Sequence, residues 1–330
     1  MLFDKASILI TGAHGFLGSH VTAAFKDYAI GKDIKIHTPT SKQMNLYDRM
    51  DVIRGFWTYQ PNIVIHLAAQ CGGIGINRAK PADFLVNNMR MTMNLLDAVR
   101  SNNQIKVLPS VEKFVGIGTV CSYPKHTPVP FKEDDLYNGY PEETNAPYGL
   151  AKRMQLEMIR SFKTQYGLNG IFLIPVNMTG EYDNFNDDSS HVIPAMITKF
   201  HAAKLGGHPT VTLWGDGSAS REFLYAGDCA DAILRATMLY DKVDPVNIGT
   251  GKEITIKELA EKIKLLVGYN GEIVWDHTKP NGQPRRCLDI SRAEEEFGFV
   301  AKVDLDEMLR RTYDWWSKKT ERILLERNEE

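Results

Sequence analysis

A tyrosine and a lysine stand four residues apart in Asn145-Ala146-Pro147-Tyr148-Gly149-Leu150-Ala151-Lys152. Residues at this spacing share one face of a helix, so the ammonium of Lys152 would lie beside the phenol of Tyr148. A nearby cation favours the phenolate and moves the pKa of a phenol, ordinarily about 10, toward neutrality. The pair is therefore a candidate for proton transfer. A core tyrosine beside a solvated lysine also satisfies the spacing, so the interpretation depends on the rest of the chain.

Glycines recur at every third position directly after the apolar run Ser7–Thr11. Gly12, Gly15 and Gly18 precede a helical pattern from Ser19 to about Tyr28. A strand, a glycine turn and a helix start in this order let the backbone approach a pyrophosphate, which the helix N-terminus attracts. The G-x-x-G-x-x-G spacing differs from the more familiar G-x-G-x-x-G, and an ordinary glycine-rich turn is the alternative. The position between strand and helix favours dinucleotide binding.

Strand-like and helix-like segments alternate along the first half of the chain. Further strands are expected at 34–37, 63–69, 113–118 and 170–174, and helices at 48–59, 81–100 and 146–166. This alternation predicts an α/β fold of the Rossmann type, with a doubly wound parallel sheet and a smaller C-terminal α/β lobe. We expect a dinucleotide-binding domain over 1–180, to which some later segments return, and a substrate-binding lobe over 181–330. Ligands of such sheets bind beyond the carboxyl ends of the strands, where the glycine loop and Thr119 lie.

The composition is that of a soluble globular enzyme: 330 residues, 43% hydrophobic, 24% charged, with a formal net charge of −2. A basic excess is absent, which argues against a nucleic-acid partner. The sequence contains no apolar run of about 18 residues, so no membrane span is expected, and residues 1–5 do not resemble a signal peptide. Cys71, Cys121, Cys229 and Cys287 are scattered, so we expect reduced thiols in a cytoplasmic protein and no metal site.

Seven segments together resemble the extended short-chain dehydrogenase/reductases, and within them the GDP-L-fucose synthases. They are Ala68–Ile74, Pro81–Phe84, Cys121–Lys125, Asn145–Tyr148, Asp183–Phe185, Ser190–Ala195 and Arg221–Leu224. The resemblance covers nearly the whole chain. The GDP-mannose 3,5-epimerases share the Gly-Gly segment and a cysteine in the same strand-end loop, but the segment Ser190–Ala195 favours the synthases.

The resemblance implies an NADPH-dependent epimerase/reductase that converts GDP-4-keto-6-deoxy-D-mannose to GDP-L-fucose. Its catalytic residues would be Thr119, Cys121, Tyr148, Lys152 and His191. Protons on carbons 3 and 5 are acidified by the ketone at carbon 4, and a thiol and an imidazole can exchange them near neutral pH. Tyr148 would then protonate the carbon-4 oxygen. Thr119 departs from the usual serine but offers the same donor and acceptor. Without the resemblance, Cys121 would be interpreted as a small buried hydrophobe and His191 as a structural histidine.

The implied cofactor is NADP(H). The resemblance places around it Gly12, His14, Gly15, Phe16, Leu17, Gly18, Ser41, Lys42, Asn45, Leu46, Leu67, Ala68, Ala69, Tyr148, Lys152, Pro175, Asn177 and His191. A dehydrogenase that selects NAD usually carries an acid at the end of the second strand. His37–Lys42 contains no acid, which favours NADP, but His14 and Ser41 stand where the family commonly has arginines, so the discrimination should be weak.

The second lobe is expected to hold the GDP moiety. The resemblance places there Asn177, Val192, Lys199, Trp214, Arg221, Arg285 and Asp289. Trp214 would stack on guanine and Arg221 would reach the pyrophosphate. An ordinary core aromatic is the alternative for Trp214.

Two other functions stay open at the level of sequence. One is a C-4 reductase or epimerase of another GDP sugar, such as a 6-deoxyheptose or colitose precursor. The other is a non-catalytic NADP-binding regulatory protein, against which the set of Thr119, Cys121, Tyr148, Lys152 and His191 argues. The resemblance also implies a homodimer formed through helices over 81–100 and 152–166.

Overall fold

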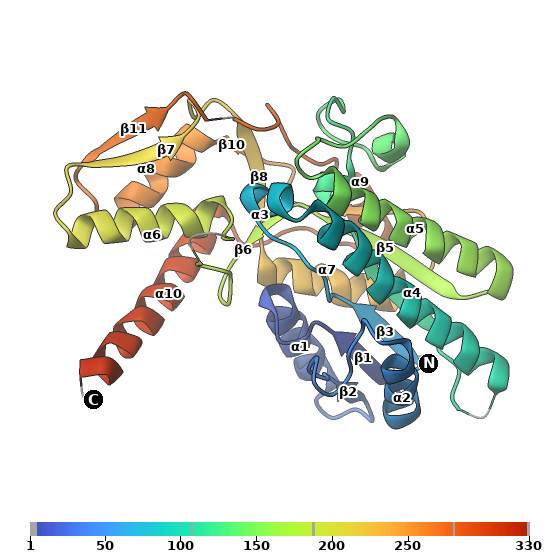
Figure 1. Ribbon diagram of the computed structural model, residues 1–330. Coiled ribbons are helices and arrows are strands. Elements are labelled where there is room, and N and C mark those ends of the chain that lie inside the picture. Colours follow the sequence, from blue (N-terminus) through green and yellow to red (C-terminus); the bar gives the residue numbers. More distant parts are fainter. Residues whose placement is uncertain (1–4, 107, 187–188, 280, 329–330) are drawn as a thin grey trace.

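A six-stranded parallel sheet forms the centre of the larger part of the molecule (Figure 1). The computed structural model describes residues 5–106, 108–186, 189–279 and 281–328. The strand order is β2-β1-β3-β4-β5-β9, and every neighbouring pair is parallel. The strands are β1 (Ser7–Thr11), β2 (Lys35–His37), β3 (Ile63–His66), β4 (Lys113–Ile117), β5 (Asn169–Pro175) and β9 (Val246–Ile248). Runs such as Ile63-Val64-Ile65 are fully buried because helices cover both faces of the sheet.

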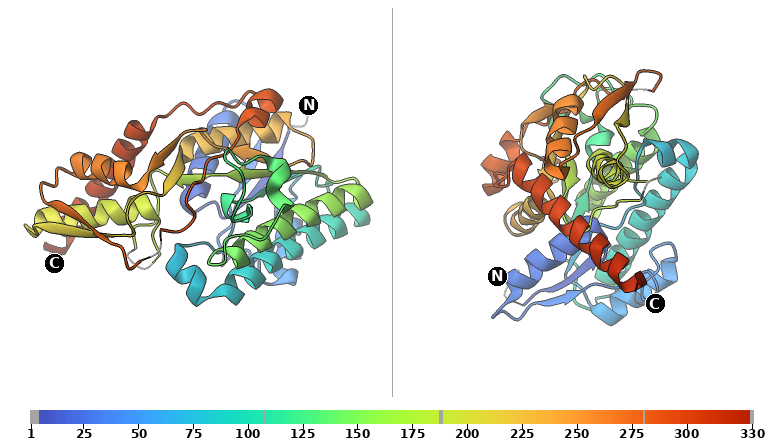
Figure 2. Two further views of the ribbon diagram at one scale, coloured as in Figure 1. Left: turned by 90° about the horizontal axis from the view of Figure 1, so that it is seen from above. Right: turned by 90° about the vertical axis from the view of Figure 1, so that its left-hand side faces the viewer.

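Helices lie on both faces of this sheet (Figures 1 and 2). One face carries α1 (Phe16–Ala29), α7 (Ala226–Leu239) and α9 (Ser291–Phe297). The other carries α2 (Arg49–Tyr59), α4 (Pro81–Ile105) and α5 (Ala146–Tyr166), with α4 and α5 side by side. The helix α5 has a proline in its first turn and ends at Gly167, whose φ of 69° suits a left-handed C-cap. The short helices α3 (Ile74–Ala79), η1 (Val120–Ser122) and η2 (Glu133–Tyr137) complete the connections.

A smaller lobe contains two short sheets and three helices. Its strands are β6 (Asn177–Thr179), β8 (Ser220–Tyr225) and β10 (Glu253–Thr255), ordered β10-β8-β6, together with the parallel pair β7 (Thr210–Trp214) and β11 (Glu272–Asp276). Its helices are α6 (Val192–Leu205), α8 (Ile256–Val267) and α10 (Leu305–Asn328), the last of which extends outward from the lobe (Figure 1). Thr255 and Glu258 form a capping box that fixes the start of α8.

Two hydrophobic cores underlie the two parts. The first lies between the large sheet and its helices, and includes residues from β9, α7 and α9 that follow residue 180 in sequence. The second packs Phe200, Phe223, Leu259, Ile263 and Met308 among the helices and strands of the smaller lobe. The division at residue 180 stays a prediction, and the segments that return to the larger part are β9, α7 and α9.

The predicted α/β fold with a doubly wound sheet is confirmed, although some bounds differ. The helix after the glycine loop begins at Phe16 rather than Ser19. The strand β3 ends at His66, because Leu67–Ala69 leaves the sheet to line the cavity at its carboxyl end.

A buried carboxylate on β8 joins three backbone segments. Glu222 is 0% exposed, and its Oε1 accepts hydrogen bonds from the N–H groups of Thr250 (2.5 Å) and Gly251 (2.8 Å). Its Oε2 accepts one from the N–H of Leu288 (2.7 Å). Burial raises the pKa of this carboxyl, whereas the N–H donors favour its ionised form. Both oxygens must therefore remain acceptors for the three donors to be satisfied.

Replacing Glu222 by glutamine should destabilise the protein. The amide NH₂ group would face a backbone N–H group, and neither group can accept a hydrogen bond from the other. A buried donor without a partner costs about 1–3 kcal/mol, so the urea midpoint of unfolding should fall clearly in Glu222→Gln. Glu272→Gln serves as the control, since Glu272 is exposed on β11. Equal midpoints for the two variants would contradict the assigned role.

Candidate active site

A cavity of about 1000 Å³ lies between the carboxyl ends of the large sheet and the smaller lobe. Its walls come from the glycine loop, the loops after β3 and β4, the start of α5, the start of α6, and β8. This volume is at the upper end of ligand pockets and suits two large ligands side by side. The cavity brings together every predicted site residue except Lys42, Arg285 and Asp289. The roles of these residues stay predictions; their positions are given below.

The glycine loop fits the phosphates of a dinucleotide. A Cβ on Gly18 would collide with the carbonyl oxygen of Gly12, which has a φ of 72°. The loop therefore closes tightly against the first turn of α1. Gly15 is the N-cap residue of α1 and has no side chain that could accept a hydrogen bond. The N–H groups of the first helical turn are therefore available to a ligand.

The region expected to bind a 2′-phosphate contains hydroxyl groups and a histidine. Thr40, Ser41 and His14 line the cavity here, and the ring of His14 is held 2.9 Å from the carbonyl oxygen of Thr38. Lys42 does not line the cavity and is exposed. The turn at Thr40, whose carbonyl accepts from the N–H groups of Gln43 and Met44, removes Lys42 from the wall. The role of Lys42 at the 2′-phosphate stays a prediction.

Thr119 and Cys121 follow β4 in one turn of 3₁₀ helix. The hydroxyl of Thr119 caps this turn by accepting from the N–H of Cys121 at 3.2 Å. The helix α5 packs directly on the same turn, since a Cβ on Gly149 would collide with the carbonyl oxygen of Cys121. Ser122 donates to the carbonyl of Gly149 at 3.1 Å. This close contact places Tyr148, the neighbour of Gly149, on the wall that carries the thiol of Cys121.

The electrostatics of Tyr148 differ from the expectation based on spacing. Burial, with smaller contributions from Cys71 and Cys121, raises the pKa of Tyr148 well above its ordinary value. Lys152 is 4% exposed, and burial lowers its pKa to about 8. Its Nζ lies 6.0 Å from the centre of the Tyr148 ring and 3.4 Å from Oε1 of Gln155. In the free chain desolvation therefore outweighs the cation, and the phenol keeps its proton.

His191 lines the same cavity as Cys121 and Tyr148, from the start of α6 in the smaller lobe. It is the N-cap residue of α6, and its side chain makes no capping hydrogen bond. The imidazole lines the cavity, and burial lowers its pKa. The start of α6, from Val192 to Ala195, lines the same wall and directs a helix N-terminus toward the cavity.

The predicted nucleotide end of the cavity is lined by Asn177, Val192, Lys199, Trp214 and Arg221. The ring of Trp214 is 59% exposed, with Nζ of Lys279 5.6 Å from its centre, which rules out the core alternative. Burial, and next the charge of Arg286, lowers the pKa of Arg221 to about 10.

In the segment between β11 and α9, Arg285 and Asp289 lie outside the cavity wall, and their roles stay predictions. Arg285 is exposed and pairs with Glu253, and Asp289 accepts from the N–H and hydroxyl of Ser291 at the start of α9. The residues of this segment that line the cavity are instead Gly282, Gln283 and Arg286. An irregular segment has no period from which to tell which of two adjacent arginines faces inward.

Cys71 also lines the cavity and was not predicted as a site residue. Its place in Ala68–Ile74, a segment that carried the family resemblance, was the available signal.

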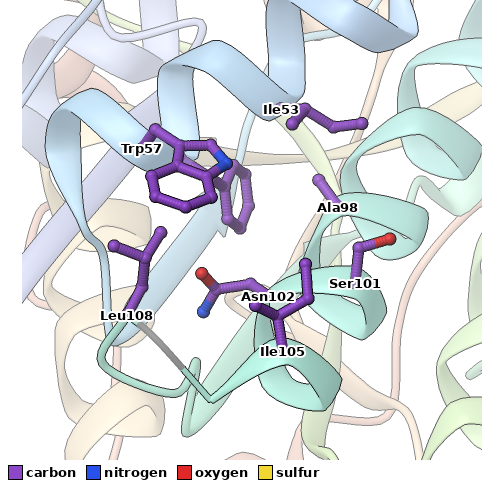
Figure 3. Close-up of a pocket in the computed structure, with 8 residues that line it drawn as sticks. Ile53, Trp57, Ala98, Ser101, Asn102, Ile105 and Leu108 are labelled. Atoms are coloured by element: carbon purple, nitrogen blue, oxygen red, sulfur yellow. The ribbon is translucent and has the colours of Figure 1, made fainter.

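A second hollow lies between α2 and α4, far smaller than the first (Figure 3). Its volume is about 30 Å³, and its lining includes Ile53, Trp57 and Ile105. This is room for about one water molecule. The larger cavity is therefore the candidate active site.

The helices that the structure describes include none with the length and apolarity to cross a membrane. Within the same described residues, His, Cys, Asp and Glu do not gather in any group of three that could bind a metal ion.

Comparison with known proteins agrees with this geometry. Residues 8–249 match the model of the NAD dependent epimerase/dehydratase family. The chain is 37% identical over 316 residues to a probable GDP-L-fucose synthase 1 from Oryza sativa subsp. japonica, covering 96% of this chain and 93% of the relative. A GDP-6-OMe-4-keto-L-xylo-heptose reductase from C. jejuni is similar in structure, with a TM-score of 0.87, 27% identity and coverage of 96% and 99% of the two chains.

A GDP-L-fucose synthetase from Naegleria fowleri bound to NADP is also similar, with a TM-score of 0.84, 26% identity and coverage of 97% and 96%. The family match and the identity to a curated relative cover most of the chain. This chain therefore belongs to the NAD dependent epimerase/dehydratase family, as an extended short-chain dehydrogenase/reductase related to the GDP-L-fucose synthases.

Proposed function

We propose that this protein is an NADPH-dependent epimerase/reductase that converts GDP-4-keto-6-deoxy-D-mannose to GDP-L-fucose. The observation that carries this proposal is that Cys121, Tyr148 and Lys152 line one cavity together with His191 from the smaller lobe. A reductase requires only the tyrosine and lysine. The thiol and imidazole add a pair that can exchange protons next to a ketone.

In the epimerisation, the thiolate of Cys121 removes a proton from carbon 3 or carbon 5, and the imidazolium of His191 returns one to the opposite face. The lowered pKa of His191 makes its imidazolium a stronger acid, which gives up the proton readily. The protonated fraction at neutral pH is correspondingly smaller. Inversion therefore requires that, of Cys121 and His191, one takes up a proton and the other already carries a proton to donate.

In the reduction, bound NADPH supplies the hydride for carbon 4. Tyr148 donates its proton to the oxygen of that carbon, which its raised pKa permits because the phenol is protonated throughout the neutral range. The ammonium of Lys152 stabilises the phenolate that remains. Since the pKa of Lys152 is lowered to about 8, this support is present below that pH and is lost as the pH rises through it.

A second candidate is a C-4 reductase of another GDP sugar. The similarity to the C. jejuni heptose reductase supports it. A simple reductase gives no role to the pair of Cys121 and His191, so the dual activity is preferred.

Three substitutions should separate the two chemistries. Cys121→Ser should reduce uptake of solvent deuterium at carbons 3 and 5 by about 10²-fold or more, because the serine hydroxyl is too weakly acidic to replace the thiolate. Tyr148→Phe should retain that exchange but lower NADPH oxidation by a similar factor. His191→Asn should allow exchange while impairing inversion. Exchange is measured by mass spectrometry of the sugar, and reduction by NADPH absorbance. Formation of the L-sugar at the normal rate by Cys121→Ser would reject the dual role and leave the C-4 reductase.

The cofactor preference should be modest. The 2′-phosphate is met by Thr40, Ser41 and His14, and no arginine lines this part of the cavity in the described chain. We expect NADPH to bind up to about tenfold tighter than NADH, since a small set of neutral donors gains only about 1 kcal/mol. Ser41→Asp should reverse the preference by repelling the phosphate and accepting from a ribose hydroxyl. Fluorescence titration measures both affinities, and tighter NADH binding by the parent protein would contradict the assignment.

We also propose a homodimer formed through α4 and α5. These adjacent helices expose Val86, Met93 and Met154, which are 45%, 53% and 42% exposed. The proposed location is the cytoplasm, in keeping with the free thiols of all four cysteines.

Light scattering after size exclusion should give twice the mass of one chain. Met93→Glu combined with Met154→Glu should give monomers, because charges at the centre of an apolar interface are costly to bury. Leu265→Glu, on an exposed position of α8, should leave the dimer intact. A monomeric parent protein would refute the dimer.

A further inference from the structure

The guanidinium of Arg286 is buried in the cavity wall. The residue is 7% exposed. Its Nε and Nη2 donate to Oε1 of Gln283 at 3.3 and 3.0 Å, and its Nη1 donates to Sγ of Cys121 at 3.6 Å. Within the described part of the chain, no carboxylate lies within ion-pair distance of this guanidinium. A buried cation is costly unless an anion compensates it.

Both members of this contact are held in place. Gln283 is anchored through its Nε2 to the carbonyl oxygen of Lys125 at 3.0 Å. The carbonyl of Arg286 accepts from the N–H of Glu222 at 3.1 Å, and the N–H of Cys121 is fixed to Thr119. The direction of the guanidinium toward the sulfur is thus set by three separate elements.

The other titratable groups around the thiol come from several elements. Arg221 on β8 and Tyr148 on α5 both interact electrostatically with Cys121. Glu142 acts on Arg221, and Cys71, from the loop after β3, acts on Tyr148. Arg286 also contributes to the lowered pKa of Arg221, so two cations share this part of the cavity. The group in direct contact with Arg286 that can become an anion is the thiol of Cys121.

We infer that Arg286 is a positioning residue, which holds the sulfur of Cys121 beside its guanidinium and directs a sulfur lone pair into the cavity. This inference rests on the proposed epimerase function. The sulfur lone pair takes a proton from the carbon beside the ketone, an S–H bond forms, and the electrons of the C–H bond pass into the enolate. Arg286 exchanges no proton in this step and acts only through the charge and direction of its guanidinium. Gln283 supports the same geometry by fixing the guanidinium from the other side.

The test is the pH dependence of Cys121 alkylation by iodoacetamide in the absence of sugar, followed by peptide mass spectrometry. The thiolate displaces iodide, so the rate reports the thiolate fraction. In Arg286→Gln, the rate at pH 7 should fall about tenfold, and the rise of the rate should move about one pH unit higher. Arg286→Lys should keep most of the rate, since the cation is retained. Alkylation of Cys71 in the same sample is the internal reference.

Arg285→Gln is the matched control for this readout. Arg285 is the adjacent residue, carries the same charge and pairs with Glu253 at the surface. Its replacement should leave the alkylation of Cys121 as in the parent protein. An unchanged pH dependence in Arg286→Gln, even with a raised KM for the sugar, would overturn the inference and leave Arg286 as a substrate-binding group only.

Failure of this inference and failure of the proposed function give different results. If Cys121→Ser still makes the L-sugar while Arg286→Gln slows alkylation, the thiolate contact stands and the epimerase assignment falls. If alkylation is unaffected while Cys121→Ser blocks deuterium exchange, the epimerase stands and the role of Arg286 falls.

Discussion

The buried carboxylate of Glu222 is the constraint on which the geometry of the cavity depends. It fixes the chain between β9 and β10 and the segment after Arg286 to the same strand. The larger part of the molecule holds that segment from the other side, since Phe131 pairs with both Cys287 and Asp289 through the backbone. Asn247 on β9 adds hydrogen bonds to the carbonyls of Phe131 and Asp289. The segment that carries Arg286 is therefore fastened to both lobes.

Desolvation decides the electrostatics of this cavity more than any single pair of charges. It raises the pKa of Tyr148 and lowers those of Lys152, His191 and Arg221. Buried cations without matching carboxylates favour anionic ligands, because the ligand supplies the missing countercharge. A dinucleotide phosphate and a nucleotide diphosphate are both anions of this kind. Binding of such an anion therefore offsets the free-energy cost of burying these cationic side chains.

The regular elements could be predicted from the sequence because their periods leave a clear pattern. The buried runs of β1, β3 and β4, the glycine loop and the helix with Tyr148 and Lys152 all lie close to where they were expected. Lys42, Arg285 and Asp289 lie in a turn and an irregular segment, where no period tells which side chain faces a cavity. The protonation state of Tyr148 could not be predicted from the sequence either. The spacing to Lys152 indicates a neighbouring cation, but it does not show the burial that raises the pKa of the phenol.

The return of β9 to the large sheet has a consequence for synthesis of the chain on the ribosome. The strand β5 pairs on one side with β4 and on the other with β9, which emerges about seventy residues later in the order of translation. Until then, one edge of the nascent sheet has open hydrogen-bonding groups next to fully buried residues such as Ile171 and Leu173. The helix α7, which packs on α1, also arrives late. The larger part of the molecule can therefore be completed only after the chain has passed through the other lobe.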